Sequence, residues 1–330
     1  MNKIGVIGAG SWGTALAVTL SNKGHDVRIW DIDRVHVQEL RANRENKRYL
    51  PGVSFCERLV PADTIEEALN GADTVLFSAP AQHFRSALES ALPYIDKEMI
   101  IINVAKGIEQ KTLMRMSEIA KEMGQHDRYA VLSGPSHAEE VGKGMPTTVV
   151  AASDNHDIAV AVQEMFSTDF LRVYTGTDIT GVELGGALKN IIALGAGISD
   201  GLGFGDNAKA AMMTRGIAEM KRLGVKMGAD VNTFAGLTGI GDLIVTCTSM
   251  HSRNRRCGIM IGEGMSPDEA VKKVGMVVEG MFTAEAAYEL ADRLGVEMPI
   301  TNEIYKLIKG QITGKEAVTN LMGRDKKPED

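Results

Sequence analysis

One lysine lies where a buried amine could transfer a proton. Lys189, with Asn190 beside it, interrupts a strongly apolar stretch over 181–202 that is predicted to form a helix buried on most sides. A charge in such a helix is costly unless it is paired or used. Desolvation also favours the neutral amine, which suits the lysine to give or take a proton near neutral pH. The alternative is an ammonium that reaches solvent at the edge of the helix.

A second lysine, Lys106, follows directly on an apolar run over 99–104 that is predicted to be a buried strand. Ligands of parallel sheets bind beside the carboxyl ends of the strands, which favours a functional ammonium here over a solvated loop lysine. Gly134 and Ser136 follow the next predicted strand. Ser136 and Glu139 are predicted to form a capping box that presents a helix N-terminus to the same edge, although the motif alone is only a good cap.

Two later segments carry groups suited to a phosphorylated ligand. The glycine-dense run 236–242 is predicted to be a loop with one acid, Asp242. A second run supplies hydroxyl, amide and guanidinium donors: Ser252, Arg253, Asn254, Arg255 and Arg256. Guanidinium groups pair well with phosphate, whereas a solvated charge run is the alternative. Cys247 lies between the two segments with no histidine base placed beside it, which favours a buried structural thiol over a nucleophile.

A nucleotide site is predicted at the start of the chain. An apolar strand over 3–7 runs into Gly8, Gly10 and Gly13 and then into a helix-forming stretch. Gly8 allows a tight turn, Gly10 lets the backbone approach a pyrophosphate, and Gly13 lets the helix pack against the strand. The helix N-terminus offers N–H groups to the phosphates. The second strand ends in Asp31, at the offset expected for an acid that binds the ribose. A turn without a ligand leaves Gly8 and Gly10 together unexplained.

The elements that position these residues predict an α/β fold in two domains. Strands are predicted at 3–7, 27–30, 74–79, 99–104, 129–132, 147–151 and 171–174, and helices between them at 35–48, 64–71 and 81–92, with a helix stop at 49–52. This alternation predicts a Rossmann-type, doubly wound, mainly parallel sheet in a dinucleotide-binding domain, residues 1–178. An all-helical substrate and catalytic domain, residues 179–330, is predicted to contain helices over 181–202, 207–223, 266–274, 283–294 and 301–309.

Composition narrows the classes of function. A chain of 330 residues with 44% hydrophobic residues can bury two cores, and a net charge of -7 argues against nucleic acid or an anionic membrane as the main partner. The 3 cysteines are odd in number and lack a Cys-x-x-Cys motif, which favours a reducing, cytoplasmic location. The 7 histidines show no metal-ligand spacing, so no metal is expected. No uninterrupted apolar run predicts a membrane anchor.

Six segments together resemble a known family: 8–15, 105–109, 132–139, 185–190, 236–246 and 252–254. In this order they are similar to the bacterial-type NAD(P)-dependent glycerol-3-phosphate dehydrogenases, over essentially the whole chain. The resemblance implies reversible reduction of dihydroxyacetone phosphate to sn-glycerol 3-phosphate, which supplies phospholipid synthesis, by a Rossmann domain and a helical domain. It implies NAD or NADP as cofactor and a small-molecule substrate, and it leaves a homodimer open.

The resemblance also implies roles for individual residues. Lys189 is the expected proton donor in reduction and the acceptor in reverse, with Lys106 as a second cation and Asp242 orienting the lysine. Substrate binding is expected at Lys106, Gly134, Ser136, Lys189, Asp242, Ser252, Arg253 and Asn254. Cofactor binding is expected at Ser11, Trp12, Lys106, Ala138, Arg253, Val277 and Glu279, in addition to Gly8, Gly10, Gly13 and Asp31 of the predicted nucleotide site.

One stretch departs from the family pattern. Many members carry His-Arg after the second strand to receive the 2′-phosphate of NADP, whereas this chain has Asp31, Ile32 and Asp33. An acid there hydrogen-bonds the ribose hydroxyls of NAD and repels a phosphate, so the sequence predicts a preference for NADH. Two rival functions are a dehydrogenase of similar architecture acting on a 3-hydroxy acid or a phosphosugar acid, and a non-catalytic NAD sensor. A sensor has no need of the lysines together with Asp242 and Arg253.

Overall fold

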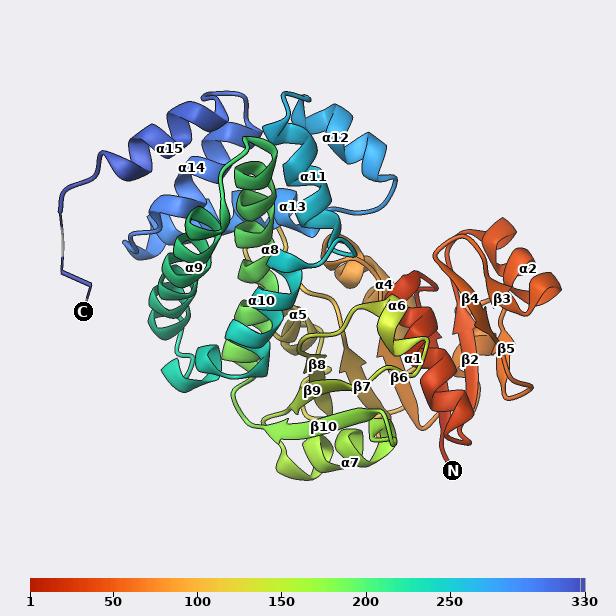
Figure 1. Cartoon of the computed structure of the whole chain (residues 1–330). Helices are drawn as coiled ribbons and strands as arrows, with labels where there is room; N and C mark the ends of the chain where they lie inside the picture. The colour runs from red at the N-terminus through yellow and green to blue at the C-terminus, as the bar shows by residue number, and fades with distance from the viewer. Residues whose placement is uncertain (327, 330) are drawn as a thin grey trace. The chain divides into compact units, whose positions relative to one another are not determined.

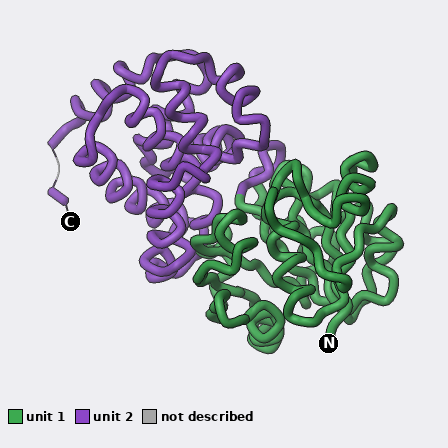
Figure 2. The backbone as a smooth tube through the Cα atoms, turned by 45° about the vertical axis from the view of Figure 1, so that its right-hand side comes forward, with its two compact units in different colours: residues 1–106, 114–183 green, residues 107–113, 184–330 purple. Residues whose placement is uncertain are grey.

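The chain divides into two compact units (Figure 2) in a computed structural model that describes residues 1–326, 328 and 329. Unit 1 consists of residues 1–106 and 114–183, and unit 2 of residues 107–113 and 184–330. Helix α8 (Ile179–Gly201) begins at the predicted domain boundary, whereas the units divide within this helix, after Glu183. The short segment 107–113 therefore belongs to unit 2, although the chain before and after it belongs to unit 1. No sequence pattern predicts this.

Unit 1 is built on an 8-stranded, mainly parallel sheet, which confirms the predicted fold class (Figure 1). The strands are β1 (Lys3–Ile7), β2 (Asp26–Trp30), β5 (Leu59–Pro61), β6 (Thr74–Phe77), β7 (Ile100–Asn103), β8 (Tyr129–Ser133), β9 (Thr147–Ala152) and β10 (Leu171–Gly176). Their order is β10-β9-β8-β7-β6-β1-β2-β5, and β8 and β9 pair antiparallel. From β1 the chain adds β2 and β5 on one side, and from β6 it adds the later strands on the other side, so the order of the strands reverses between the parallel neighbours β1 and β6. Open α/β sheets bind ligands at such a switch point.

The central strands are buried on both faces, which explains their continuous apolar sequences. In β6, Val75 and Phe77 belong to one buried cluster, and Leu76, which points to the opposite face, belongs to another. The helices of unit 1 are α1 (Ser11–Asn22), α2 (Arg34–Asn43), α3 (Ile65–Leu69), α4 (Phe84–Ala91), α5 (Met116–Glu122), α6 (Ala138–Val141) and α7 (His156–Phe166), with single 3₁₀ turns at Ala81–His83 and Leu92–Tyr94.

The segment after α2 differs from the prediction of a helix over 35–48. Helix α2 ends earlier because Arg44 takes a left-handed conformation, with φ 53°. The chain then forms a two-stranded hairpin of β3 (Glu45–Asn46) and β4 (Leu50–Ser54). The predicted helix stop at 49–52 is therefore wrong: these residues belong to the hairpin turn and its second strand, where Pro51 is tolerated because the sheet has only edge strands.

Unit 2 is helical, as predicted. Its helices after α8 are α9 (Asp206–Lys226), α10 (Asp242–Thr248), α11 (Arg253–Gly262), α12 (Pro267–Val274), α13 (Glu279–Leu294), α14 (Pro299–Ile308) and α15 (Gly314–Met322), with a 3₁₀ segment at Val231–Ala235 and a π-helical turn at Leu237–Gly241. The sequence analysis missed α10, α11 and α15, which are short. The glycine-dense run 236–242, predicted as a loop, is mostly that π-helical turn, and Asp242 begins α10.

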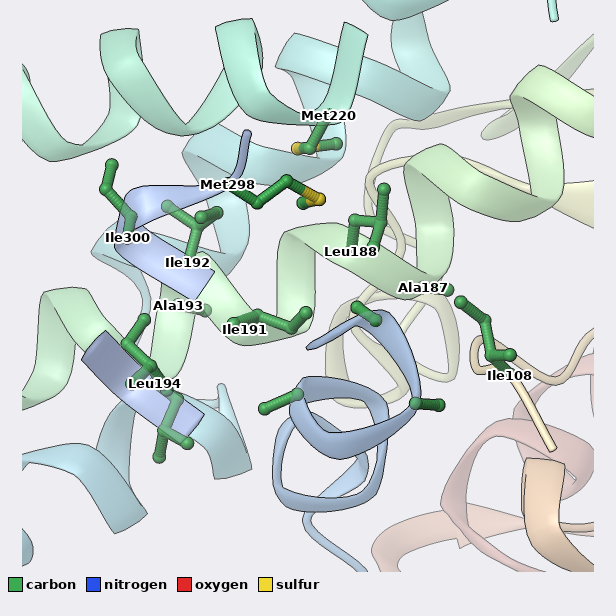
Figure 3. Packing of buried hydrophobic residues seen from close by; sticks show 14 of the residues in the cluster. Ile108, Ala187, Leu188, Ile191, Ile192, Ala193, Leu194, Met220, Met298 and Ile300 are labelled. Carbon is green, nitrogen blue, oxygen red and sulfur yellow. The ribbon is translucent and has the colours of Figure 1, made fainter. Parts of the chain in front are cut away.

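Helix α8 is the core of unit 2 (Figure 3). Leu188, Ile191 and Leu194 are at most 1% exposed, and Ile108, from the segment 107–113, joins the same buried cluster. Among the described helices α8 is the one long and apolar enough to cross a membrane by length and composition, and the apolar window that meets this criterion is 100% buried. Burial on all sides is a property of a core helix in a folded domain.

Glycines let α8 and α11 touch along their backbones. A Cβ on Gly197 or Gly201 of α8 would collide with the carbonyl oxygen of Arg255 or Ile259 on α11. In the opposite direction, a Cβ on Gly258 or Gly262 of α11 would collide with carbonyl oxygens of α8, those of Leu194 and Ile198. Each helix thus presents two glycines four residues apart to its partner, and this spacing allows the closest approach of two helices. Helix α11 is thereby held against the C-terminal half of α8.

Candidate functional site

The glycine turn after β1 has the geometry of a nucleotide cradle. Gly8 has φ 108°, which favours glycine, and a Cβ there would lie 2.9 Å from the backbone nitrogen of Ala79. A Cβ on Gly13 would collide with the carbonyl oxygen of Gly8, so α1 packs closely on the turn. A Cβ on Gly10 would meet nothing within 4 Å. The turn is therefore closed on the protein side and open beside Gly10.

Helix α1 directs its N-terminus at this open side. The predicted cofactor residues Ser11 and Trp12 are its first two residues, and Gly10 is its N-cap. The first four N–H groups of an α-helix have no acceptor within the helix, and here no side chain of the cap accepts one. Unpaired amide groups beside an open glycine fit a pyrophosphate.

Asp31 lies directly after β2, as predicted, and is bound to the glycine turn. Its Oδ2 accepts the Ala9 N–H at 2.8 Å, and its Oδ1 accepts the Asp33 N–H at 3.0 Å. Asp33 is the N-cap of α2 and forms an ion pair of 2.7 Å with Arg48. The Arg48 guanidinium, with the His36 and Val35 N–H groups, lowers the pKa of Asp33. Asp33 is thus a paired carboxylate, whereas Asp31 is oriented by backbone N–H groups.

The structure brings Lys106, Gly134 and Ser136 together at the carboxyl ends of β7 and β8. Lys106 Nζ donates to the Gly134 carbonyl oxygen at 2.9 Å, and Ser136 Oγ donates to the same oxygen at 2.8 Å. The predicted capping box of Ser136 and Glu139 is wrong. The N-cap of α6 is His137, which makes no side-chain cap, and the Ser136 hydroxyl donates to the Gly134 carbonyl oxygen instead. Ala138, predicted to contact the cofactor, is the first residue of α6 and is 6% exposed.

Within unit 2, Lys189 is paired and buried. Its Nζ donates to Asp242 Oδ1 at 2.9 Å and to Thr246 Oγ1 at 2.8 Å, and the three residues are 6%, 1% and 3% exposed. Thr246 also donates to the Asp242 carbonyl oxygen at 2.6 Å. The ammonium is therefore held by two oxygens of α10, and the alternative of a solvent-exposed lysine is excluded. The sequence analysis missed Thr246, although its position one helical turn after Asp242 places both on one face.

A second group of hydrogen-bonded residues lies next to Lys189 and includes Asn190, the following residue. Asn254 Nδ2 donates to Asn190 Oδ1 at 2.9 Å, and Asn254 Oδ1 accepts the Gly280 N–H at 2.8 Å. A Cβ on Gly280 would lie 2.6 Å from the Asn190 carbonyl oxygen, so α13 packs directly on α8 here. Asn254, predicted to bind substrate, thus joins α8, α11 and α13 and keeps one amide hydrogen beyond its bond to Asn190. This explains why a polar residue follows Lys189 in an apolar helix.

The remaining predicted residues of unit 2 lie at helix N-termini. Ser252 is the N-cap of α11, and its side chain accepts the Arg255 N–H at 3.2 Å. Arg253 is the first residue of α11 and is half-buried. Glu279 is the first residue of α13, and the half-buried Val277 lies two residues before it. Helix N-termini attract anions, which fits a ligand that carries phosphate.

The two buried cysteines do not fit catalysis. Cys247 is buried on α10, and burial raises its pKa to about 12, so the thiol stays protonated at neutral pH. Burial also raises the pKa of Cys257 to about 11. Within residues 1–326, 328 and 329, no three His, Cys, Asp or Glu side chains form a group that could hold a metal ion.

Comparison with known families covers nearly the whole chain. Residues 3–159 match the family described as NAD-dependent glycerol-3-phosphate dehydrogenase N-terminus. Residues 178–319 match the family described as NAD-dependent glycerol-3-phosphate dehydrogenase C-terminus. The two matches follow the order in which the Rossmann-type and helical parts occur in the chain.

Individual proteins agree with the family matches. A glycerol-3-phosphate dehydrogenase [NAD(P)+] of Clostridium perfringens is 50% identical over 330 residues, covering 100% of both chains. The protein of the same name from Pelotomaculum thermopropionicum is 53% identical and covers 98% of this chain and 94% of its own. The crystal structure of glycerol-3-phosphate dehydrogenase from Coxiella burnetii has a TM-score of 0.94 at 39% identity, covering 98% of this chain and 99% of the other.

Proposed function

The chain belongs to the NAD-dependent glycerol-3-phosphate dehydrogenase family, and we propose that Lys189 is the proton donor with which it reduces dihydroxyacetone phosphate. The enzyme is an oxidoreductase that uses NAD(P)H and forms sn-glycerol 3-phosphate. The observation that carries the proposal for Lys189 is its buried contact with Asp242 and Thr246. Supply of glycerol 3-phosphate to phospholipid synthesis is the role we propose for the product.

The residues present fit a dinucleotide, because Gly10 leaves open space where α1 presents unpaired N–H groups. When bound, NAD(P)H supplies the hydride that reduces the substrate carbonyl. Negative charge develops on the carbonyl oxygen as the hydride arrives, so a fixed cation and a proton stabilise the transition state. Lys189 would donate its proton to this oxygen in reduction and accept it in reverse. Asp242 and Thr246 orient the ammonium, and Lys106 is proposed as the second cation.

The test of the whole proposal is a direct assay. Purified protein is mixed with NADH and dihydroxyacetone phosphate, and loss of NADH absorbance is followed against a reaction without substrate. We expect turnover with dihydroxyacetone phosphate. We expect none when NAD+ is mixed with a 3-hydroxy acid or a phosphosugar acid to test the oxidative direction. Binding of NADH without turnover of any of these substrates would instead support a sensor.

Arg253 is proposed to bind the substrate phosphate from the N-terminus of α11. We expect Arg253→Ala to raise KM for dihydroxyacetone phosphate about 10-fold to 100-fold, since a hydrogen bond between charged groups contributes about 1.5–3 kcal/mol. The efficiency with unphosphorylated dihydroxyacetone should change little. Arg222→Ala is the control, because Arg222 binds the carbonyl oxygen of Glu297 through its guanidinium. Equal losses for both substrates would show that Arg253 does not bind the phosphate.

We also propose a preference for NADH over NADPH, because Asp31 occupies the end of β2. Like charges a few ångströms apart repel by a few kcal/mol at an effective dielectric of about 20, enough for roughly 100-fold discrimination. Asp33 adds to this and also binds Arg48. Asp33→Ser keeps a good N-cap, removes one carboxylate and leaves the Arg48 guanidinium paired with Glu39 alone. The ratio of kcat/KM for NADH to that for NADPH should then fall roughly 10-fold.

The matched control for Asp33→Ser is Asp230→Ser, which also removes an N-cap carboxylate but lies in unit 2. It should leave the NADH to NADPH ratio unchanged. A parent enzyme that prefers NADPH would show that Asp31 does not lie at the adenine ribose.

We propose a cytoplasmic location. Three free cysteines are in keeping with action in the reducing cytoplasm. A homodimer is tested by sedimentation velocity on the full chain.

A further inference from the structure

The backbone N–H and carbonyl groups of Ala9, in the glycine turn, are hydrogen-bonded by side chains of other segments of unit 1. Asp31 accepts the Ala9 N–H. The Ala9 carbonyl oxygen accepts a hydrogen bond from Asn46 Nδ2 at 2.8 Å and lies 3.2 Å from His36 Nε2. Ala9, His36 and Asn46 are 0%, 1% and 0% exposed. We call Asp31, His36 and Asn46 the Ala9 clamp.

Holding the carbonyl of Ala9 also orients the N–H of Gly10. The two groups belong to one planar trans peptide and point in opposite directions. With the oxygen facing His36 and Asn46, the Gly10 N–H points away from the clamp, and Gly10 is the N-cap of α1 beside open space. We propose that Asn46 and His36 are positioning residues for dinucleotide binding. They fix the Ala9–Gly10 peptide so that its N–H joins those of the first turn of α1 in binding the pyrophosphate.

Asn46 is fixed in the orientation that this role requires. Its Oδ1 accepts the Tyr49 N–H at 3.0 Å, so the amide presents nitrogen and not oxygen to Ala9. The same nitrogen lies 2.7 Å from Thr14 Oγ1 on α1. Asn46 thus connects the β3–β4 hairpin, the glycine turn and the first helix, and it cannot rotate without losing these bonds.

His36 contributes from α2. Its ring packs edge to face against Tyr49, with ring centroids 5.0 Å apart at an angle of 76°. Its Nε2 must carry a hydrogen to donate to the Ala9 carbonyl oxygen. These two donors, together with the Thr14 hydroxyl 3.4 Å from the same oxygen, hold the peptide plane before the cofactor arrives, so binding requires less reorganisation.

The inference rests on the proposed function for the identity of the ligand, and its test measures binding without dihydroxyacetone phosphate. Asn46→Ala removes the amide, whereas His36→Phe keeps the ring and its packing on Tyr49 and removes only the donor. For each we expect the Kd of NADH and of ADP-ribose to rise about 10-fold, the effect of one lost hydrogen bond. The kcat at saturating NADH should stay within about 2-fold of the parent, because the clamp does not touch the reacting atoms.

A merely structural role predicts a lower melting temperature and unchanged Kd values. Gln163→Ala is the control, because Gln163 Nε2 donates to the Val173 carbonyl oxygen at 2.8 Å in the same unit, away from the glycine turn. It should lower the melting temperature and leave both Kd values unchanged. If Asn46→Ala does not fold, His36→Phe decides the question.

Kd values within 2-fold of the parent in the folded clamp variants, or an equal loss in Gln163→Ala, would overturn the inference. A parent that binds NADH but does not reduce dihydroxyacetone phosphate would overturn the proposed function alone, since the binding comparison does not depend on turnover.

Discussion

Replacing Lys189 by methionine is expected to lower kcat about 1,000-fold or more while NADH binds with nearly unchanged Kd. The residue acts on the substrate oxygen, where removal of one fixed donor typically costs about 10²–10³ in rate and loss of proton transfer adds to this. The Lys189 ammonium is the group that Asp242 and Thr246 orient, and both partners remain in the variant. The measurement is kcat by NADH oxidation and Kd by NADH fluorescence. A rate within about 10-fold of the parent, 1.4 kcal/mol in barrier, would exclude this role.

The same change also leaves the Asp242 carboxylate buried without its cation, which destabilises a fold by about 3–5 kcal/mol. A second variant, Lys189→Met with Asp242→Leu, separates the two effects, because replacing both charges by apolar groups is nearly neutral. The double variant should regain most of the free energy of unfolding and none of the turnover. Recovery of turnover in the double variant would show that the single variant had failed through misfolding.

The second large effect is expected from one methyl group, in Gly258→Ala. Alanine is favoured over glycine in a helix by about 0.5–1 kcal/mol, but here its Cβ would collide with the Leu194 carbonyl oxygen and lie 2.8 Å from the Ile198 nitrogen. Backbone atoms cannot give way unless α8 and α11 separate. We expect the free energy of unfolding to fall by about 3 kcal/mol or more, at the upper end for overpacking. Urea denaturation of the full chain, followed by circular dichroism, measures it.

Gly205→Ala is the matched control, since a Cβ at this N-cap of α9 would meet nothing within 4 Å. Its free energy of unfolding should stay within about 1 kcal/mol of the parent. If Gly258→Ala proves as stable as this control, the backbone contact between α8 and α11 does not limit the fold.

Local sequence patterns predicted the features of this protein that depend on residues close together in the sequence. Continuous β-branched runs identified the buried strands, and the glycine spacing after β1 identified the turn that precedes α1. Lys189 could be selected because its charge conflicts with the apolar periodicity around it. Each of these patterns lies within a few consecutive residues, so the secondary structure and the burial of those residues can be predicted together.

The partners of those residues depend on contacts between distant segments and could not be predicted in the same way. Asn254 is predicted to bind substrate, and its bonds to Asn190 on α8 and Gly280 on α13 could not be predicted from its neighbours in sequence. The Ser136 capping box followed a valid local pattern, but the Gly134 carbonyl oxygen competes successfully for the hydroxyl. The hairpin of β3 and β4 replaced the end of a predicted helix because Asn46 is bound by the glycine turn and α1.

The segment 107–113 links the order of synthesis to the completion of folding. Ile108 and Leu113 share a buried cluster with Leu188 and Ile191 of α8, yet a ribosome releases them about 75 residues before α8 begins to supply those partners. While β8, β9 and β10 emerge and pair, this loop has no native place to bury its side chains. A nascent chain paused there exposes apolar surface that a chaperone can bind. Cleavage at the division between the units would leave the same loop stranded on the amino-terminal fragment, so that fragment is a poor candidate for expression alone.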